Sequence, residues 1–252
     1  MLKIDFNADV GEGAGNEEEL MKYISSANIA CGGHAGDEEM MKKTVALAIV
    51  HDVCIGAHPG YADKPNFGRK EMNLTSEQIV DLVAEQIYTL SKITLGLGGK
   101  LSHVKPHGAL YNLAGRDSVA ADAIVRAVAL VNPELIVFGL SGSLMARESA
   151  AAGLFFANEV FADRTYLDDG SLSPRSLPNA VISDPETCIK QVLQMVVQGS
   201  VTSLGGKTIH LEADTLCLHG DGLQATVLAT RIHASLLAHG ICIDRPTWLH
   251  RG

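Results

Sequence analysis

The sequence predicts an α/β fold, a single (β/α)7-type barrel that covers residues 1–252 as one domain. The chain has 252 residues, close to the roughly 250 of a typical β/α barrel. Short apolar runs alternate with longer amphipathic segments, which is typical of parallel strands joined by crossover helices. No proline- or serine-rich linker and no shift in composition divides the chain.

Seven apolar runs are predicted to be the strands of this barrel. They are four to seven residues long, which suits strands and is short for helices. The predicted strands are Leu2–Asn7, Ala27–Cys31, Val53–Ala57, Leu101–Lys105, Leu135–Leu140, Phe155–Phe161 and Thr215–Leu218.

The longer segments between these runs are predicted to be helices. In the second of them, Thr75 and Gln78 have the spacing of a capping box, which marks a helix start. The predicted helices are Glu38–Val50, Ser76–Leu95, Asp117–Val131, Ser143–Ala152, Pro185–Val197 and Leu223–Ala238. Two long polar segments, 60–73 and 163–183, follow strand ends, and we expect them to form lids over the barrel mouth.

The charge and cysteine content exclude several classes of protein. The chain has 20 Lys and Arg against 29 Asp and Glu, a net charge of −9, and no basic cluster. Nucleic-acid and anionic-membrane binding both need a basic surface, so neither is expected. The five cysteines are scattered and odd in number, which favours a reducing compartment. Because no apolar leader follows Met1, we expect a cytoplasmic protein.

Six polar blocks rich in His, Asp and Gly lie at the ends of apolar runs. In a β/α barrel, side chains at the carboxyl ends of the strands converge on one mouth. The blocks are therefore expected to line one pocket, which indicates an enzyme. They are Asn7–Glu12, Asn28–Asp37, Gly56–Gly60, His103–Gly108, Glu159–Arg164 and Cys217–Asp221.

The first block supplies Asn7, Asp9 and Glu12 as candidate site residues. Asp9 directly follows the first predicted strand, and a carboxylate there is costly unless it is paired. It is therefore a candidate base or cation ligand. Glu12 is either a substrate contact or a favourable charge at a helix start.

The second and third blocks supply two histidines. His34 lies among glycines, and we expect it to be exposed to a ligand rather than packed, whereas Asp37 is expected to cap the helix over 38–50. His58 precedes Pro59-Gly60 and is either a substrate contact or a surface histidine. Arg69, in the loop that follows, is either a substrate contact or a solvated charge.

The fourth block is the most informative. In an extended strand His103 and Lys105 point the same way, because side chains alternate between faces. His107 would lie roughly 13 Å from His103 along a strand, but Pro106 ends the strand and allows His107 to turn back toward the pocket. A lysine in a barrel mouth must be paired or bind an anion.

The last two blocks add charged groups from the 163–183 loop and the final strand. Asp163, Arg164 and Arg175 are either a solvated loop or a clamp for an anionic substrate. His219 is expected to face the mouth. The nearby Gly205-Gly206-Lys207-Thr208 is predicted to be a turn, because position 201 is Val where a phosphate-binding loop requires Gly.

Taken in order, these blocks resemble the LamB/YcsF family. The matching stretches run from residue 5 to residue 221 and are DFNADVGEG, SANIACGGHAGD, GAHPGYAD…FGRK, HVKPHGALYN, EVFADRTYLDDGSL…R and LCLHGD. Small departures at Ala62, Lys70 and Asn179 lie in loops.

The resemblance implies a seven-stranded barrel of the glycoside hydrolase/deacetylase type. It also implies ATP-dependent hydrolysis of 5-oxo-L-proline to L-glutamate by the A-type component of a 5-oxoprolinase, together with two other subunits of the B and C types. Since no phosphate-binding loop is present, the ATP site is expected to be unconventional or in a partner.

For this chemistry we expect Asp9 or His103 to act as base. Lys105, with His107 or His219, would stabilise the developing oxyanion. Arg164 or Arg175 would hold the substrate carboxylate.

Two alternatives remain open. The first is a metal-dependent deacetylase or amidohydrolase with Asp9, His103 and His107 as ligands, because the His-x3-His spacing is similar to that of polysaccharide deacetylases. The second is a subunit that binds a lactam without performing chemistry.

Overall fold

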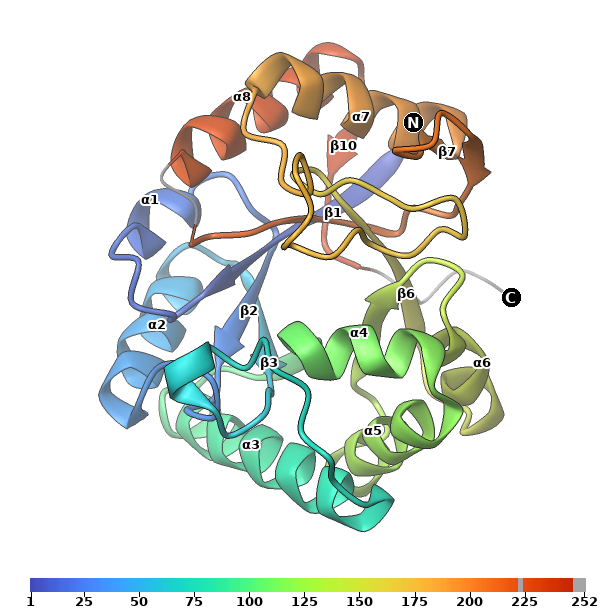
Figure 1. Ribbon diagram of the computed structural model, residues 1–252. Coiled ribbons are helices and arrows are strands. Elements are labelled where there is room, and N and C mark those ends of the chain that lie inside the picture. Colours follow the sequence, from blue (N-terminus) through green and yellow to red (C-terminus); the bar gives the residue numbers. More distant parts are fainter. Residues whose placement is uncertain (222–223, 247–252) are drawn as a thin grey trace.

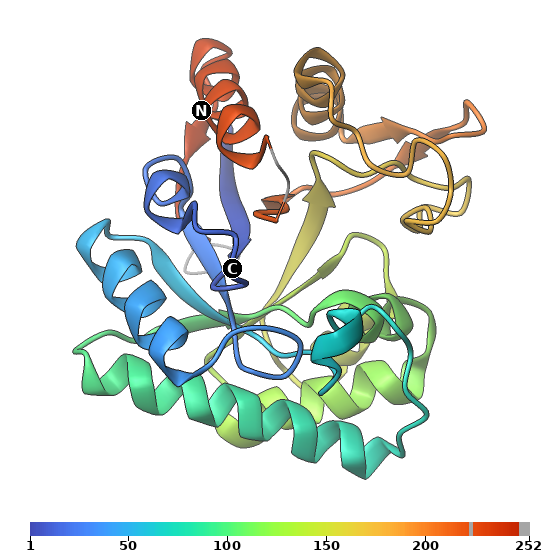
Figure 2. The ribbon, with the colours of Figure 1, turned by 60° about the vertical axis from the view of Figure 1, so that its left-hand side comes forward.

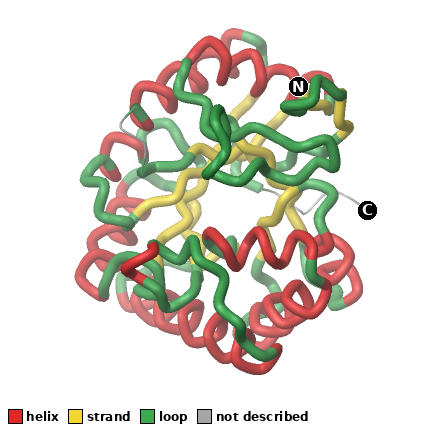
Figure 3. The backbone as a smooth tube through the Cα atoms, viewed as in Figure 1, coloured by secondary structure: helices red, strands yellow, loops and turns green. Residues whose placement is uncertain are grey.

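The computed structural model describes residues 1–221 and 224–246, and its centre is a closed barrel of seven parallel strands (Figures 1 and 3). Ring closure follows from the pairing of the first strand with both of its neighbours, Asn7 facing Ser26 on one side and Cys217 on the other. In ring order the strands are β1 (Lys3–Val10), β2 (Ser26–Ala30), β3 (Cys54–His58), β4 (Leu101–Val104), β5 (Ile136–Leu140), β6 (Phe156–Phe161) and β9 (Thr215–Leu218). The predicted barrel is confirmed. A short further strand, β10 (Cys242–Ile243), pairs with the start of β1 outside the ring.

Helices surround this barrel (Figures 1 and 2). They are α1 (Glu17–Leu20), α2 (Glu38–Val50), α3 (Ser76–Gly96), α4 (Gly108–Arg116), α5 (Ser118–Val131), α6 (Leu144–Ala151), α7 (Pro185–Gln198) and α8 (Ala225–Ala238). The six predicted helices are present, although Leu223, the predicted start of the last one, lies outside the described residues. Within the described part of the chain, no helix is both long and apolar enough to cross a membrane.

Two helix starts have the caps that the sequence predicts. The Thr75 hydroxyl accepts a hydrogen bond from the Gln78 N–H, and the Gln78 side chain accepts one from the Thr75 N–H. Asp37 caps α2 by accepting a hydrogen bond from the Met40 N–H at 2.8 Å. Both caps satisfy N–H groups that a helix start leaves without partners.

Helix α4 and a hairpin of β7 (Ser200–Thr202) with β8 (Thr208–His210) were not predicted. Helix α4 has only nine residues, too few for a clear hydrophobic period. The hairpin strands have three residues each. The predicted turn at Gly205-Gly206 joins these two strands, so this segment follows the geometry of a hairpin turn and not that of a phosphate-binding loop.

The side chains of β1 divide between the interior of the barrel and the layer under the helices. Ile4, Phe6 and Ala8 belong to the main hydrophobic core. Asp5 and Asn7 are buried on the other face and contact side chains of other strands. Because strand side chains alternate, the apolar core lies between barrel and helices, and the interior of the barrel is polar.

Candidate active site

A cavity of about 750 Å³ lies at the carboxyl ends of the barrel strands. Five of the six polar blocks contribute to its lining. Residues from these blocks in the lining include Asp9, His58, Lys105, His107, Phe161, Arg164 and His219. Helix α4 and the 163–183 loop also line it, through Tyr111 and Arg175 among others. Strand β1 runs to Val10, so Asp9 lies within this strand rather than after it.

Lys105 crosses the barrel interior and is 2% exposed. Its Nζ is 2.9 Å from Asp9 Oδ1 and 2.9 Å from Glu159 Oε1. It also donates to Cys217 Sγ at 2.9 Å. Burial opposes the charge, but the Asp9 and Glu159 carboxylates raise the pKa of Lys105 well above its ordinary value. The site therefore holds a fixed cation at the cavity floor.

Asp9 remains ionised in this environment. Its Oδ1 accepts hydrogen bonds from Lys105 Nζ and from Asn28 Nδ2 at 2.8 Å. Burial opposes ionisation, but His58 and Lys105 hold the pKa of Asp9 well below its usual range. A carboxylate with such a low pKa is a weak general base.

Asn7 positions this floor rather than lining the cavity. Its Nδ2 donates to Glu159 Oε1 at 3.0 Å and to Thr215 Oγ1 at 2.6 Å. Its Oδ1 accepts from Asn28 Nδ2 at 2.7 Å. The amide is fully buried, and these contacts do not support the prediction that Asn7 touches substrate.

The contacts of His103 do not support its predicted role as base. This imidazole is fully buried and lies outside the cavity lining. Its Nε2 donates to Asn28 Oδ1 at 2.8 Å, and its Nδ1 lies 2.7 Å from the Ser102 hydroxyl. Burial lowers the pKa of His103 to about 3. Both ring nitrogens are occupied, so neither can bind a metal or take a proton from water without breaking these contacts.

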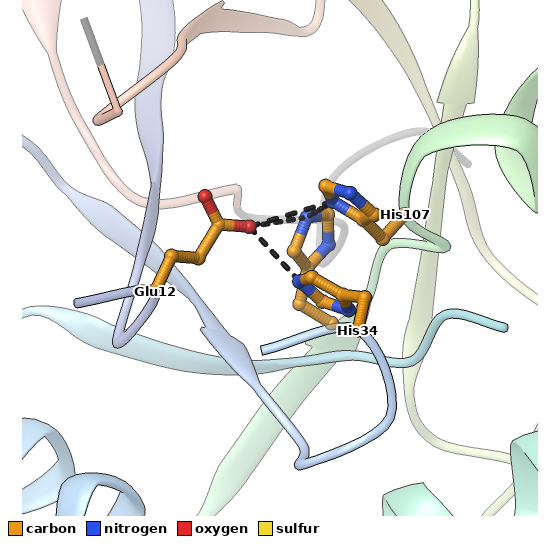
Figure 4. A group of neighbouring side chains, drawn as sticks. Glu12, His34 and His107 are labelled. Carbon is orange, nitrogen blue, oxygen red and sulfur yellow. Dashed lines mark hydrogen bonds and ion pairs between the residues drawn. The ribbon is translucent and has the colours of Figure 1, made fainter. Parts of the chain in front are cut away.

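Three other imidazoles and one carboxylate converge beside the cavity (Figure 4). They belong to Glu12, His34, His58 and His107, and their ligand atoms lie within 4.8 Å of one another. This set differs from the predicted metal ligands Asp9, His103 and His107, of which only His107 belongs to it. The prediction that His34 is exposed is wrong, because it is 1% exposed and stacks on His107 at 3.6 Å.

Burial and neighbouring charges set the protonation of this cluster. Burial lowers the pKa of His34 to about 2 and that of His107 well below its ordinary value. Burial opposes the charge on His58, yet the Asp9 carboxylate raises its pKa. Burial, and next the Asp9 charge, raise the pKa of Glu12 to about 8.

His219 and Asp163 form a second polar pair at the cavity. His219 Nδ1 lies 3.0 Å from both Asp163 carboxylate oxygens and donates to them. Burial opposes ionisation of Asp163, but His219 keeps its pKa below the usual value. The His219 Nε2 has no hydrogen-bond partner among residues 1–221 and 224–246. A base oriented by a carboxylate through its other nitrogen is a recurrent catalytic arrangement.

The three predicted arginines have different environments. Arg164 is buried and donates to the carbonyls of Ala180 and Ser173, so it holds the 163–183 loop folded. Arg69 forms an ion pair with Asp221 across the mouth. Arg175 is exposed, lines the cavity, and has no ion pair within the described residues. Of the three, Arg175 is the one free to bind an anion.

Glu159 and Asn28 were not among the predicted site residues. Glu159 is fully buried in β6 and holds Lys105 and Asn7. The signal available in the sequence was a single charge inside the apolar run 155–161. The Asn28 side chain forms hydrogen bonds with Asp9, Asn7 and His103. Like Glu159, Asn28 is a single polar residue in a predicted strand that is otherwise apolar.

The closed parallel barrel and the charged cavity at its carboxyl end define a β/α-barrel protein with a site of the enzymatic type. The chain belongs to the LamB/YcsF family, whose sequence model matches residues 4–249.

Three comparisons place it further. It is 50% identical over 248 residues to a protein of Geobacillus thermodenitrificans that is named as the A-type component of 5-oxoprolinase, with 97% of each chain covered. A lactam utilization protein from Thermus thermophilus is similar in structure, with 41% identity, a TM-score of 0.90 and coverage of 96% of this chain and 99% of the other. A deacetylase, T48, shares the fold at 12% identity and a TM-score of 0.50, with 97% and 88% coverage.

Proposed function

We propose that this chain is the A-type component of a 5-oxoprolinase and that it acts with two other subunits. The reaction is the ATP-dependent hydrolysis of 5-oxo-L-proline to L-glutamate with release of ADP and phosphate. Relatives that are 50% and 48% identical over nearly the whole chain carry the name of this 5-oxoprolinase component. The structural observation that carries the proposal is the cavity where Lys105, Asp9 and the His219–Asp163 pair face one space.

The chemistry explains why such a reaction uses ATP. A lactam is stabilised by resonance and is a poor electrophile, so water attacks it slowly. Phosphorylation of the ring oxygen by ATP activates the ring carbon. Water then adds to this carbon, and the bond to the ring nitrogen breaks, with the nitrogen taking a proton; the product is the γ-acyl phosphate of glutamate. A second water cleaves this acyl phosphate to glutamate and phosphate. The protein must supply a base for the water and a positive charge for the developing oxyanion.

His219 fits the role of the base better than the two residues expected from the sequence. Its Nδ1 proton is held by Asp163, which leaves the lone pair on Nε2. His58 and Lys105 keep the pKa of Asp9 low, which makes Asp9 a weak base. Both ring nitrogens of His103 are occupied by hydrogen bonds to Ser102 and Asn28. His219 also lines the cavity, so it can reach a water molecule there.

Lys105 is the candidate for stabilising negative charge. Its ammonium is already positioned by two carboxylates and does not have to reorganise during the reaction, which is the main requirement for electrostatic catalysis. Arg175 is the candidate for binding the substrate carboxylate. Because the sequence contains no phosphate-binding loop, we place most of the ATP site in a partner subunit or at the rim of the cavity. We further propose a reducing, cytoplasmic location, which the five free cysteines favour.

Reconstitution with the two partner subunits tests this function. The assay measures glutamate and ADP released from 5-oxo-L-proline, with and without ATP. We expect turnover only in the presence of ATP and of this chain. Substitution of Asp9 or Lys105 by Ala is expected to lower kcat/KM by a factor that corresponds to several kcal/mol of activation free energy. An effect of this size is typical of lost electrostatic stabilisation.

Asp163→Asn provides a variant that keeps the size and polarity of the side chain, so that loss of activity is not confused with loss of folding. Near-normal turnover in all three variants would contradict the proposal. Glutamate release that does not depend on ATP would instead favour a metal-dependent amidohydrolase.

A further inference from the structure

Four candidate metal-binding atoms from separate segments converge beside the cavity: Glu12 Oε1, His34 Nε2, His58 Nε2 and His107 Nδ1. Glu12 Oε1 is 2.9 Å from His34 Nε2, 3.4 Å from His107 Nδ1 and 3.8 Å from His58 Nε2. The nitrogens of His58 and His107 are 2.9 Å apart. Figure 4 shows Glu12 facing the rings of His34 and His107.

These four separations are close to the edges of a small coordination tetrahedron, and every pair of ligand atoms in the cluster lies within 4.8 Å. Zinc binds histidine nitrogen and carboxylate oxygen at about 2.0–2.2 Å, and the ligand atoms of a tetrahedral site then lie roughly 3.3–3.5 Å apart. The observed separations of 2.9, 3.4, 3.8 and 2.9 Å fall on both sides of this value. An ion bound by all four atoms would require the stacked rings of His34 and His107 to rotate, because the lone pair of an imidazole nitrogen lies in the ring plane and two parallel planes do not meet.

Hydrogen bonds to backbone carbonyls fix which nitrogen of two rings is free. His58 Nδ1 lies 2.7 Å from the Lys105 carbonyl, and His107 Nε2 lies 3.0 Å from the Phe67 carbonyl. A carbonyl only accepts, so each ring places a proton there. In the neutral rings, the remaining nitrogens then direct lone pairs at each other across 2.9 Å. Such carbonyl contacts are typical of histidines that bind metals.

One proton shared between His58 and His107 would relieve that pair alone. It would leave Glu12 Oε1 and His34 Nε2, which lie 2.9 Å apart, as a separate pair. A divalent cation satisfies the four converging atoms together. It also places a positive charge beside the buried Glu12 carboxyl, which favours the ionised form.

The cluster is closely packed. The four residues lie at the carboxyl ends of β1 to β4 or within the four residues that follow them. The rings of His34 and His107 stack in parallel, with an interplanar angle of 1°. A Cβ atom at Gly60 would lie 2.7 Å from His34 Nδ1, so the lack of a side chain there gives the ring its space. The packing therefore keeps the four side chains close together, and metal binding would reorient the two stacked rings.

We propose that Glu12, His34, His58 and His107 bind one divalent transition-metal ion, and that zinc is the ion this donor set suits best. Imidazole nitrogen with one carboxylate oxygen in a tetrahedral arrangement is a common zinc environment. His58 and His107 also line the cavity, so the ion lies at its wall. The site does not depend on the proposed reaction.

Metal content and metal affinity test the proposal on the full chain without an affinity tag. The protein is stripped with a chelator, dialysed and titrated with Zn²⁺ by calorimetry. We expect one equivalent of zinc per chain, and tetrahedral absorption bands when Co²⁺ replaces it. Glu12→Gln and His34→Gln are each expected to weaken zinc affinity by at least 10-fold. His210→Gln, which changes an exposed histidine outside the cluster, is expected to bind zinc as the wild type does.

The readouts do not involve activity, so the metal site and the proposed function can fail separately. Circular dichroism verifies the fold of each variant. Glu12 lies in a loop, and Gln has nearly the same size as Glu, so Glu12→Gln is expected to leave the fold intact. A chain that binds no zinc beyond the dialysis background would overturn the proposal. Unchanged zinc affinity in both cluster variants would do the same, because it would place the zinc elsewhere.

Discussion

Replacement of Lys105 by Met tests the charge balance inside the barrel. At 2.9 Å from each of two carboxylates, the ammonium gains roughly 6 kcal/mol of gross attraction per contact at an effective dielectric constant of about 20. Desolvation of the three groups cancels much of this gain. Removing one partner of a buried pair nevertheless leaves an uncompensated charge, which costs about 3–5 kcal/mol. We therefore expect Lys105→Met to lower the free energy of unfolding by about 3–5 kcal/mol at pH 7.

The loss of stability in Lys105→Met should become smaller as the pH falls. In the wild type the pKa of Asp9 is held far below its unfolded value. This carboxylate therefore contributes stability above its unfolded pKa, and the contribution is lost as the pH falls through the folded pKa. Without Lys105 the pKa of Asp9 rises, and protonation relieves the buried charge. The difference between wild type and variant should shrink as the pH is lowered from 7 toward 4.

Urea denaturation followed by far-UV circular dichroism measures both effects. Lys100→Met is the matched control, because Lys100 pairs with Glu134 at 3.5 Å on the surface, where both side chains are more than three-quarters exposed. Such pairs contribute little, so this variant should unfold as the wild type does. If Lys105→Met is as stable as the control at pH 7, or if its deficit does not shrink in acid, the account of the barrel interior is wrong.

Three further predictions follow from single contacts. His219→Asn should lower kcat of the reconstituted enzyme by about 10²–10⁴-fold, the usual loss on removing a general base, whereas His210→Asn should not change it; equal kcat in the two variants would exclude His219 as base. Gly56→Ala should lower the free energy of unfolding by about 1–3 kcal/mol through overpacking, because its Cβ would collide with the buried imidazole of His103. Gly96→Ala, with open space around it, should be neutral or stabilising in the same urea titration. Burial raises the pKa of Asp5 to about 6, so its contribution to stability falls as the pH rises from 4 to 7, by roughly 3 kcal/mol for two pKa units; Asp5→Asn should abolish that fall in denaturation curves recorded at pH 4 and pH 7.

The barrel could be predicted because each strand carries its own local signal. The runs that became β1 to β6 and β9 are short, apolar and separated by helix-length segments, and parallel pairing then requires crossover helices. Helix α4 and the β7–β8 hairpin lack such a signal, because nine and three residues are too short to show a period. Their existence depends on packing against the barrel rather than on local preference.

Strand geometry predicted the direction of two central side chains of the site. Alternation placed His103 and Lys105 on one face, and both are inside the barrel. The break at Pro106 allowed His107 to turn back, and it contacts His58. Alternation cannot say how deep a side chain lies, so His103 and Lys105 were both expected to reach the substrate, although of the two only Lys105 lines the cavity.

The histidine cluster depends on contacts between loops that no local pattern records. His34 has glycine neighbours and was expected to be exposed, but its ring fills the space left by Gly60 on another segment. Glu12 reaches the same place from the loop after β1. The meeting of these segments follows from the ring order of the strands, which is a property of the whole fold.

A structure of the assembled enzyme with 5-oxo-L-proline tests the central claim most directly. We predict density for the lactam in the cavity lined by Asp9, Lys105 and His219, with the lactam oxygen toward the Lys105 ammonium. Density for the lactam only in a partner subunit, with this cavity holding solvent, would contradict the assignment of the barrel mouth as the site of ring opening.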